Sequence, residues 1–128
     1  MGSRIVLPTA IVSSRPSSDS IQVGGDLVQV QFAPISLASS GISTLVSGVA
    51  GHQIRVISYL LVASASVIFT WYSNPTGAIS GPLPVGASTV VPCGFNPMGW
   101  VQTAVGDDLA VNLSGNVSVG GHFQYIIV

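Results

Sequence analysis

The chain has 128 residues, of which 48% are hydrophobic and only 5% are charged, and its formal net charge is −1. Soluble domains carry about 25% charged residues. This chain therefore has too few arginines to neutralise the phosphates of a nucleic acid, and little charge repulsion opposes its self-association. Its 15 glycines and 8 prolines disfavour a helical bundle. The composition predicts one domain that works inside an assembly and binds no nucleic acid.

The first 40 residues are predicted to form an extended N-terminal arm. Residues 4–12 are expected to be extended, as an arm or an edge strand. Their apolar stretch is short and interrupted by Pro8, which is unlike a secretory signal peptide. The main domain is then expected over residues 41–128.

One strand is predicted near the end of this extension. Apolar and polar residues alternate over residues 27–32, which predicts a half-buried strand. Its inward-facing residues are expected to be Val28, Val30 and Phe32. Because proline removes a backbone donor, Pro34 is expected to end the strand.

Residues 54–72 are the most hydrophobic part of the chain and are about long enough to span a bilayer. The serines and the threonine of this stretch, Ser58, Ser64, Ser66 and Thr70, nevertheless all lie at even-numbered positions. A period of two is typical of a strand. We therefore expect strands here, with no transmembrane helix and no membrane partner.

Beyond residue 42, short apolar runs alternate with turn signals. The strongest turn is residues 74–77, where proline presets φ and glycine supplies a positive φ. The last run, residues 119–128, is apolar on both faces and is predicted to be covered on both sides. About eight such strands predict an all-β antiparallel sandwich or barrel. The predicted strands are residues 43–47, 52–63, 66–73, 78–80, 88–92, 100–103, 108–113 and 119–128.

Few residues suggest chemistry. Asp107 and Asp108 follow a glycine, as in a triplet of some polymerase active sites, but Gly-Asp between two predicted strands is ordinary turn chemistry. His52 and His122 would form a metal site with these aspartates only if the loops converged, since metals need three or four ligands. The chain also lacks the Gly-x-Ser-x-Gly nucleophile motif. We therefore predict no enzyme, and no catalytic, cofactor-binding or metal-binding residue.

Residues 93–100 form the most unusual segment, because Phe95, Met98 and Trp100 accompany two glycines and a proline. Exposed aromatic residues in a loop are typical of a contact surface. Alternatively, the loop folds over one end of the sandwich with Trp100 in the core. The two interpretations can apply to different residues. The single cysteine, Cys93, cannot form an internal disulfide and is expected to act as a buried or half-buried hydrophobe.

Five runs of residues together resemble a small group of proteins from tailed bacteriophages. That group has a Lys-Ile-Arg-Val-type strand, a Phe-Asn-Pro-x-Gly-Trp/Phe loop, a Gly-Glu/Asp-x-Leu strand and a closing Val-Gly-Gly strand. The resemblance covers residues 48–128 and departs at His52-Gln53, where lysine is common in the group. The matching runs are 51–59 (GHQIRVISY), 79–82 (ISGP), 94–100 (GFNPMGW), 106–109 (GDDL) and 120–125 (GGHFQY).

This resemblance implies a jelly-roll β-sandwich that forms a homotrimer. It also implies a cement or decoration protein, made in the host cytoplasm, that binds and stabilises the shell of the major capsid protein at its outer surface. The expected arm contacts are Ile5, Val6, Leu7, Ile11 and Val12. The expected trimer or capsid contacts are Phe95, Met98, Trp100 and Tyr125.

The alternative is a carbohydrate- or receptor-binding jelly-roll module of a phage fibre or head vertex. Aromatic rings beside amide and carboxylate groups suit the stacking and hydroxyl recognition of sugars. Trp71, Tyr72, Trp100 and Asn96 would then form the binding platform.

Overall fold

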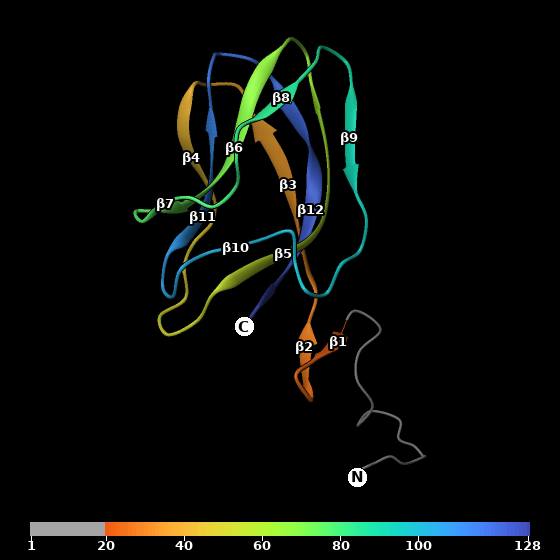
Figure 1. The fold of residues 1–128 in the computed structure, drawn as a ribbon, viewed down its shortest axis with the longest axis vertical. Helices are drawn as coiled ribbons and strands as arrows, with labels where there is room; N and C mark the ends of the chain where they lie inside the picture. The colour runs from red at the N-terminus through yellow and green to blue at the C-terminus, as the bar shows by residue number, and fades with distance from the viewer. Residues whose placement is uncertain (1–19) are drawn as a thin grey trace.

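A computed structural model describes residues 20–128. Strands and the turns between them build this whole region, and none of these residues is helical. Two five-stranded antiparallel sheets pack face to face as a sandwich, and a separate two-stranded hairpin projects beyond one end (Figure 1). The predicted all-β sandwich is therefore confirmed.

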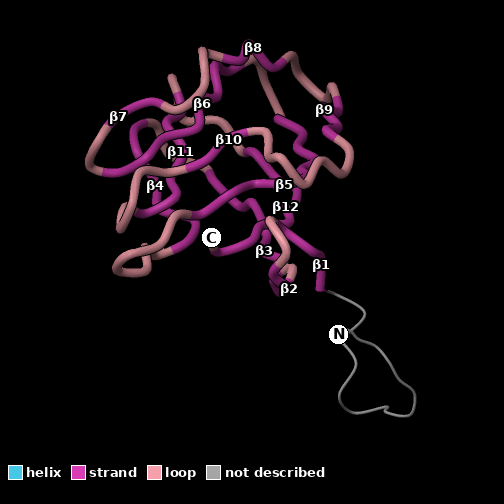
Figure 2. Tube along the Cα trace, turned by 60° about the horizontal axis from the view of Figure 1, so that its bottom comes forward, coloured by secondary structure: helices cyan, strands magenta, loops and turns pink. Residues whose placement is uncertain are grey.

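The first sheet, the β5 sheet, has β5 (Ile54–Ala63) and β12 (Val119–Ile127) at its centre. On one side β12 pairs with β3 (Gln31–Leu37). On the other side β5 pairs with two short strands in succession, β9 (Val90–Cys93) and β10 (Val101–Gln102). Figure 2 shows these strands from a second direction.

The second sheet, the β6 sheet, has β6 (Val67–Asn74) and β11 (Asp108–Leu113) at its centre. The outer side of β11 carries β4 (Gly41–Val46). The other side of β6 carries β7 (Gly77–Ala78) and β8 (Leu83–Val85). The projecting hairpin consists of β1 (Ser20–Val23) and β2 (Asp26–Gln29).

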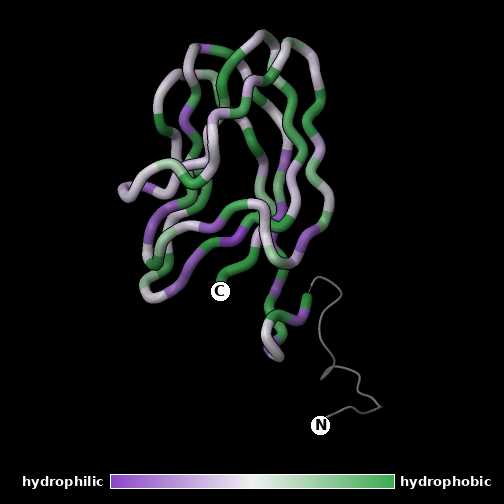
Figure 3. The backbone as a smooth tube through the Cα atoms, in the orientation of Figure 1, coloured by the Kyte–Doolittle hydropathy of each residue, from purple (hydrophilic) through white to green (hydrophobic). Residues whose placement is uncertain are grey.

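The main core lies between the two sheets and is built around aromatic rings. Trp71 is fully buried and contacts Tyr59, Phe69 and Phe123 edge to face, with ring centroids 5.2, 5.2 and 5.9 Å away. These rings come from strands of both sheets and interlock them. Hydrophobic and more polar residues alternate along many of the strands, as a half-buried sheet requires (Figure 3).

A second, smaller core lies on the outer side of the β5 sheet, beneath the hairpin. The pairing of β5 with β12 shifts by one residue between Ser58 and Val56, so Ile57 is a bulge. Ile57 therefore leaves the main core and packs with Ile126 and Val30, against partly buried residues of the hairpin. The predicted coverage of the last strand on both sides therefore holds at Ile126, whereas His122 on the same face of β12 is exposed.

The predicted strand over residues 27–32 is wrong in its boundaries. Val30 belongs to no strand and separates β2 from β3. β3 then continues through Pro34. Proline is tolerated there because β3 is an edge strand that pairs on one side only. In β3 the inward residues include Ile35, whereas Phe32 is 64% exposed, contrary to its predicted inward orientation.

The remaining predicted strands are all found, with ends that move by a few residues. The predicted turn at residues 74–77 joins β6 to β7. β8 was not predicted, because its three residues include Pro84. The predicted division at residue 40 falls between β3 and β4, although β3 already pairs with β12 in the sandwich.

Candidate interaction surface

The outer face of the β5 sheet presents apolar side chains to solvent. Strand pairing aligns its outward positions in three cross-strand rows. Phe32 is 64% and Val90 is 52% exposed, so large hydrophobic groups lie at both edges of the face. We call these outward positions the apolar face. Each row is given in the strand order β3, β12, β5 and, for the first two rows, β9. The first row is Ser36, Gly120, Val62 and Val90, and the second is Pro34, His122, Leu60 and Pro92. The third row is Phe32, Gln124 and Ser58.

The apolar face contains no aspartate, glutamate, lysine or arginine. Two of its polar side chains satisfy each other, because the Ser58 hydroxyl donates to Gln124 Oε1 at 2.7 Å. A polar group that already has a partner costs less free energy to bury than an unpaired one. Covering this pair therefore costs less desolvation free energy than covering two unpaired polar groups.

The loop between β9 and β10, residues 94–100, continues the edge of this sheet past the β5 bulge. The Asn96 N–H donates to the Ile57 carbonyl at 2.7 Å, and the Trp100 N–H donates to the Val56 carbonyl at 2.7 Å. The bulge thus provides two adjacent acceptors that hold both ends of the loop. Ile57 also packs under the hairpin, so one residue contacts loop and hairpin.

Hydrogen bonds within the loop fix its conformation further. The Asn96 side-chain oxygen accepts from the Met98 N–H at 3.1 Å, and the Asn96 carbonyl accepts from the Gly99 N–H at 2.9 Å. The Trp100 indole N–H donates to the Gly94 carbonyl at 2.8 Å. The backbone of the loop is therefore held by several hydrogen bonds of its own.

Arg55 supports the loop from β5. Its guanidinium donates to the Pro97 carbonyl at 3.1 Å and to Gln102 Oε1 at 2.7 Å. Gly99 has a φ of +90°, and a Cβ there would lie 2.5 Å from Arg55 Cγ. Position 99 therefore requires glycine both for its backbone conformation and for the close approach of Arg55.

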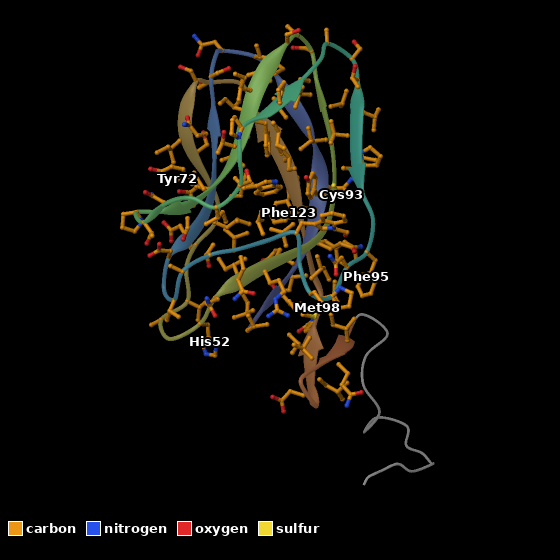
Figure 4. The ribbon with its side chains drawn as sticks, in the orientation of Figure 1. His52, Tyr72, Cys93, Phe95, Met98 and Phe123 are labelled. Atoms are coloured by element: carbon orange, nitrogen blue, oxygen red, sulfur yellow. The ribbon has the colours of Figure 1, made fainter. Side chains whose placement is uncertain are left out.

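The structure places the predicted loop residues in the solvent. Phe95 is 60% and Met98 is 81% exposed, and both lie near the hairpin end of the molecule (Figure 4). Trp100 is 46% exposed, so it belongs to the surface rather than to the core. These three side chains extend the exposed hydrophobic surface beyond the apolar face.

Tyr125, the fourth expected contact, does not lie with these exposed loop residues. It is partly buried against the main core, with its ring centroid 5.6 Å from that of Phe123. Its hydroxyl and Gln31 Oε1 are 3.2 Å apart and form a hydrogen bond between β12 and β3. The expected arm contacts, Ile5, Val6, Leu7, Ile11 and Val12, lie outside the described residues.

The proposed sugar platform is not assembled. Trp71 is fully buried in the main core, so its assignment to an exposed platform is wrong. Tyr72 lies on β6 of the other sheet, away from the loop (Figure 4). Asn96 uses its side-chain oxygen within the loop, and its amide nitrogen lies 3.4 Å from the Gly99 carbonyl.

The aspartates of the Gly-Asp-Asp run act as acceptors in turns. Asp107 accepts hydrogen bonds from the Thr76 hydroxyl, from the Ser73 hydroxyl at 2.8 Å and from the Thr76 N–H at 3.3 Å. These bonds, those of Thr76 first, lower the pKa of Asp107 below its ordinary value. Asp108 accepts from the Gly48 N–H at 2.6 Å. Both carboxylates therefore hold neighbouring loops against the end of the sandwich.

The two histidines lie apart from each other. His52 Nδ1 is 3.3 Å from the Val128 carbonyl, whereas His122 is exposed on the apolar face. Within residues 20–128, no three histidine, cysteine, aspartate or glutamate side chains gather as metal ligands would. Burial, with a smaller contribution from half-buried Cys93, raises the pKa of Tyr59 to about 12.

Most of the apolar face was not predicted from the sequence. A signal was present, because Leu60 and Val62 are apolar at positions where an exposed face should be polar. Phe32 and Pro92 could be added only once the strand pairing was known.

Among residues 20–128 there is no helix with the length and hydrophobicity that crossing a membrane requires. Comparisons of the chain with protein-family models, curated proteins and solved structures found no match.

Proposed function

We propose that this chain is a non-enzymatic structural protein of a tailed-bacteriophage virion. In this proposal it is made in the host cytoplasm and binds the outer surface of the capsid as a homotrimer, where it stabilises the shell of the major capsid protein. The observation that carries the proposal is the uncharged apolar face with the rigid, apolar β9–β10 loop beside it. Exposed apolar side chains that gather on one uncharged face favour a protein partner, and Phe32, Val90 and Pro92 are exposed on this face.

The strand order supports a jelly roll as the finer description of the sandwich. The two sheets have the orders β3-β12-β5-β9 and β4-β11-β6-β8. Along the chain, β3, β4, β5 and β6 alternate between the sheets, and so do β9, β11 and β12. Eight strands in two sheets are the usual content of a jelly roll, which occurs in viral capsid proteins and also in lectins.

Burial of apolar surface is the proposed mechanism of stabilisation. An obligate contact buries about 2,000 Å² or more, and each Å² of apolar surface contributes roughly 25 cal/mol before the costs of association. Phe95 and Met98 project from a loop whose conformation is already fixed, so little conformational entropy is lost when they bind. We assign them, with Trp100, as anchors of the contact and residues 5–12 as additional arm contacts.

The experiment combines sedimentation of the purified chain with co-sedimentation on expanded shells assembled from the major capsid protein of the same phage. We expect homotrimers, free or joined to one another, that bind the shells. A Phe95→Asp/Met98→Asp variant should bind at least tenfold more weakly, because two charges would have to be desolvated in the contact. Ile68→Asp is the matched control, since Ile68 is an exposed apolar residue of the opposite sheet.

A wild-type chain that stays monomeric and does not bind the shells would overturn the proposal. A glycan array with the same protein separates it from carbohydrate recognition. We expect no binding on the array, and clear binding would favour the alternative module.

A further inference from the structure

The sandwich has four sheet edges, and they differ in how they are protected against pairing with another strand. Pro34 lies in β3, Pro84 in β8 and Pro92 in β9. The other strands on these edges, β7 and β10, have two residues each. Proline and short length are two of the ways in which proteins prevent edge strands from pairing with other chains.

The fourth edge, β4, lacks proline and short length, and its bulge, at Leu45, lies beyond the four regularly paired residues 41–44. Its six residues, GISTLV, include no proline and no charge. Within the described part of the chain, β4 pairs with β11 alone, so one side of its backbone presents N–H and C=O groups without a neighbouring strand. Ile42 is 48% exposed on this strand, and Thr44 is also exposed. β4 is therefore the edge best suited to accept another strand.

The geometry points to a second copy of this chain as the occupant, with β4 pairing antiparallel to β4 of that copy around a two-fold axis. Two identical antiparallel strands can hydrogen-bond to each other around a two-fold axis, because each strand presents the same backbone N–H donors and C=O acceptors to the other. Opposite residues of an antiparallel pair share a face, so a centre at Ser43 places Ile42 against Thr44 of the second copy. Such β-branched pairs stabilise a sheet, and the uncharged strand does not repel its copy.

This contact goes beyond the proposed function, because it does not depend on a capsid. It also uses a different surface from the apolar face, which lies on the other sheet. A two-fold contact at β4 would join two trimers edge to edge, or two single chains where no trimer forms.

Disulfide cross-linking tests the pairing directly. In a Cys93→Ser background, Ile42→Cys/Thr44→Cys places each cysteine opposite a cysteine of the second copy. Opposite residues have Cα atoms about 4.5–5.5 Å apart, which lies within the range for a disulfide. The matched control is Ile68→Cys/Thr70→Cys on β6, which has the same residue types and spacing but both sides already paired. We expect at least tenfold more covalent dimer from the β4 variant.

A second variant tests the same contact without cysteines. Ile42→Lys/Thr44→Lys should reduce the sedimenting mass to that of the unpaired trimer or, where no trimer forms, the single chain, because like charges would lie opposite each other across the axis. Ile68→Lys/Thr70→Lys should keep the wild-type mass, and near-ultraviolet circular dichroism checks that each variant is folded.

Three results would overturn the inference. They are an absence of cross-linking at β4, equal cross-linking in the β6 control, or cross-linking that begins only when residues 1–19 are removed. The last result would assign the β4 edge to that segment. Binding to capsid shells is measured separately, so failure here does not decide the proposed function.

Discussion

The two cores on either side of the β5 sheet differ in size and in chemistry. The main core is centred on four aromatic rings contributed by both sheets. The hairpin core has three buried aliphatic residues, Val30, Ile57 and Ile126, and it joins the β1–β2 hairpin to the sandwich. The bulge at Ile57 in β5 links the two cores, because it turns the Ile57 side chain from the main-core face of the strand to the hairpin-core face. One strand therefore stabilises the sandwich and also positions the hairpin and loop at its end.

The largest expected effect comes from emptying the main core. Trp71→Ala should lower the free energy of unfolding by about 3–5 kcal/mol, because the cavity left by the indole is surrounded by rings that cannot collapse into it. Urea unfolding monitored by circular dichroism measures this change. Trp100→Ala is the matched control, since 46% of this side chain is exposed, and its cost should be at least twofold smaller. Equal losses would show that the two tryptophans do not differ in burial as described.

The hairpin core should respond more weakly and more locally. Ile57→Ala is expected to cost about 2–3 kcal/mol, near the lower end for a buried isoleucine. Because Ile57 packs against the hairpin, amide hydrogen exchange should increase most in β1 and β2, and least in β6.

Ile68→Ala, at an exposed isoleucine, should stay within about 0.5 kcal/mol of wild type. If exchange in the Ile57→Ala variant rose equally in both sheets, the two cores would form one cooperative unit and the comparison would fail.

The strands could be predicted because alternation of apolar and polar residues depends only on neighbours in the chain. Residues 108–113 illustrate this, since the predicted boundaries are those of β11. The bulge at Ile57 could not be predicted, because Ile57 continues the apolar pattern of Tyr59 and Leu61 and only the pairing with β12 reveals the shift. A shift of one residue reverses the face of every position beyond it.

The candidate surface was predictable only in part, for a related reason. The aromatic content of residues 94–100 indicated a contact loop without knowledge of the fold. Phe32 was expected in the core, because alternation identifies residues that share a face but not which face is buried. The alternative of carbohydrate binding placed Trp71 on a platform, although it sits at an inward position of a half-buried strand. In both cases the missing information was the packing of one sheet on the other.

A smaller effect is expected outside both cores, at the turn held by Asp107. The hydrogen bonds from Thr76 and Ser73 lower the pKa of this carboxyl below its ordinary value of 3.8. A carboxyl with a depressed folded-state pKa adds stability above its unfolded-state pKa, and that stability is lost as the pH falls through the folded-state value. The urea midpoint of the wild type should therefore fall as the pH drops below about 4.

Asp107→Asn should reduce this acid dependence, because an amide oxygen still accepts a hydrogen bond but does not titrate. Asp26→Asn, at an exposed position of the hairpin, is the control and should keep the wild-type profile. If the Asp107→Asn profile matched the wild type below about pH 4, the carboxylate would not hold the β6–β7 turn, and the acid sensitivity would have to arise at another carboxyl group.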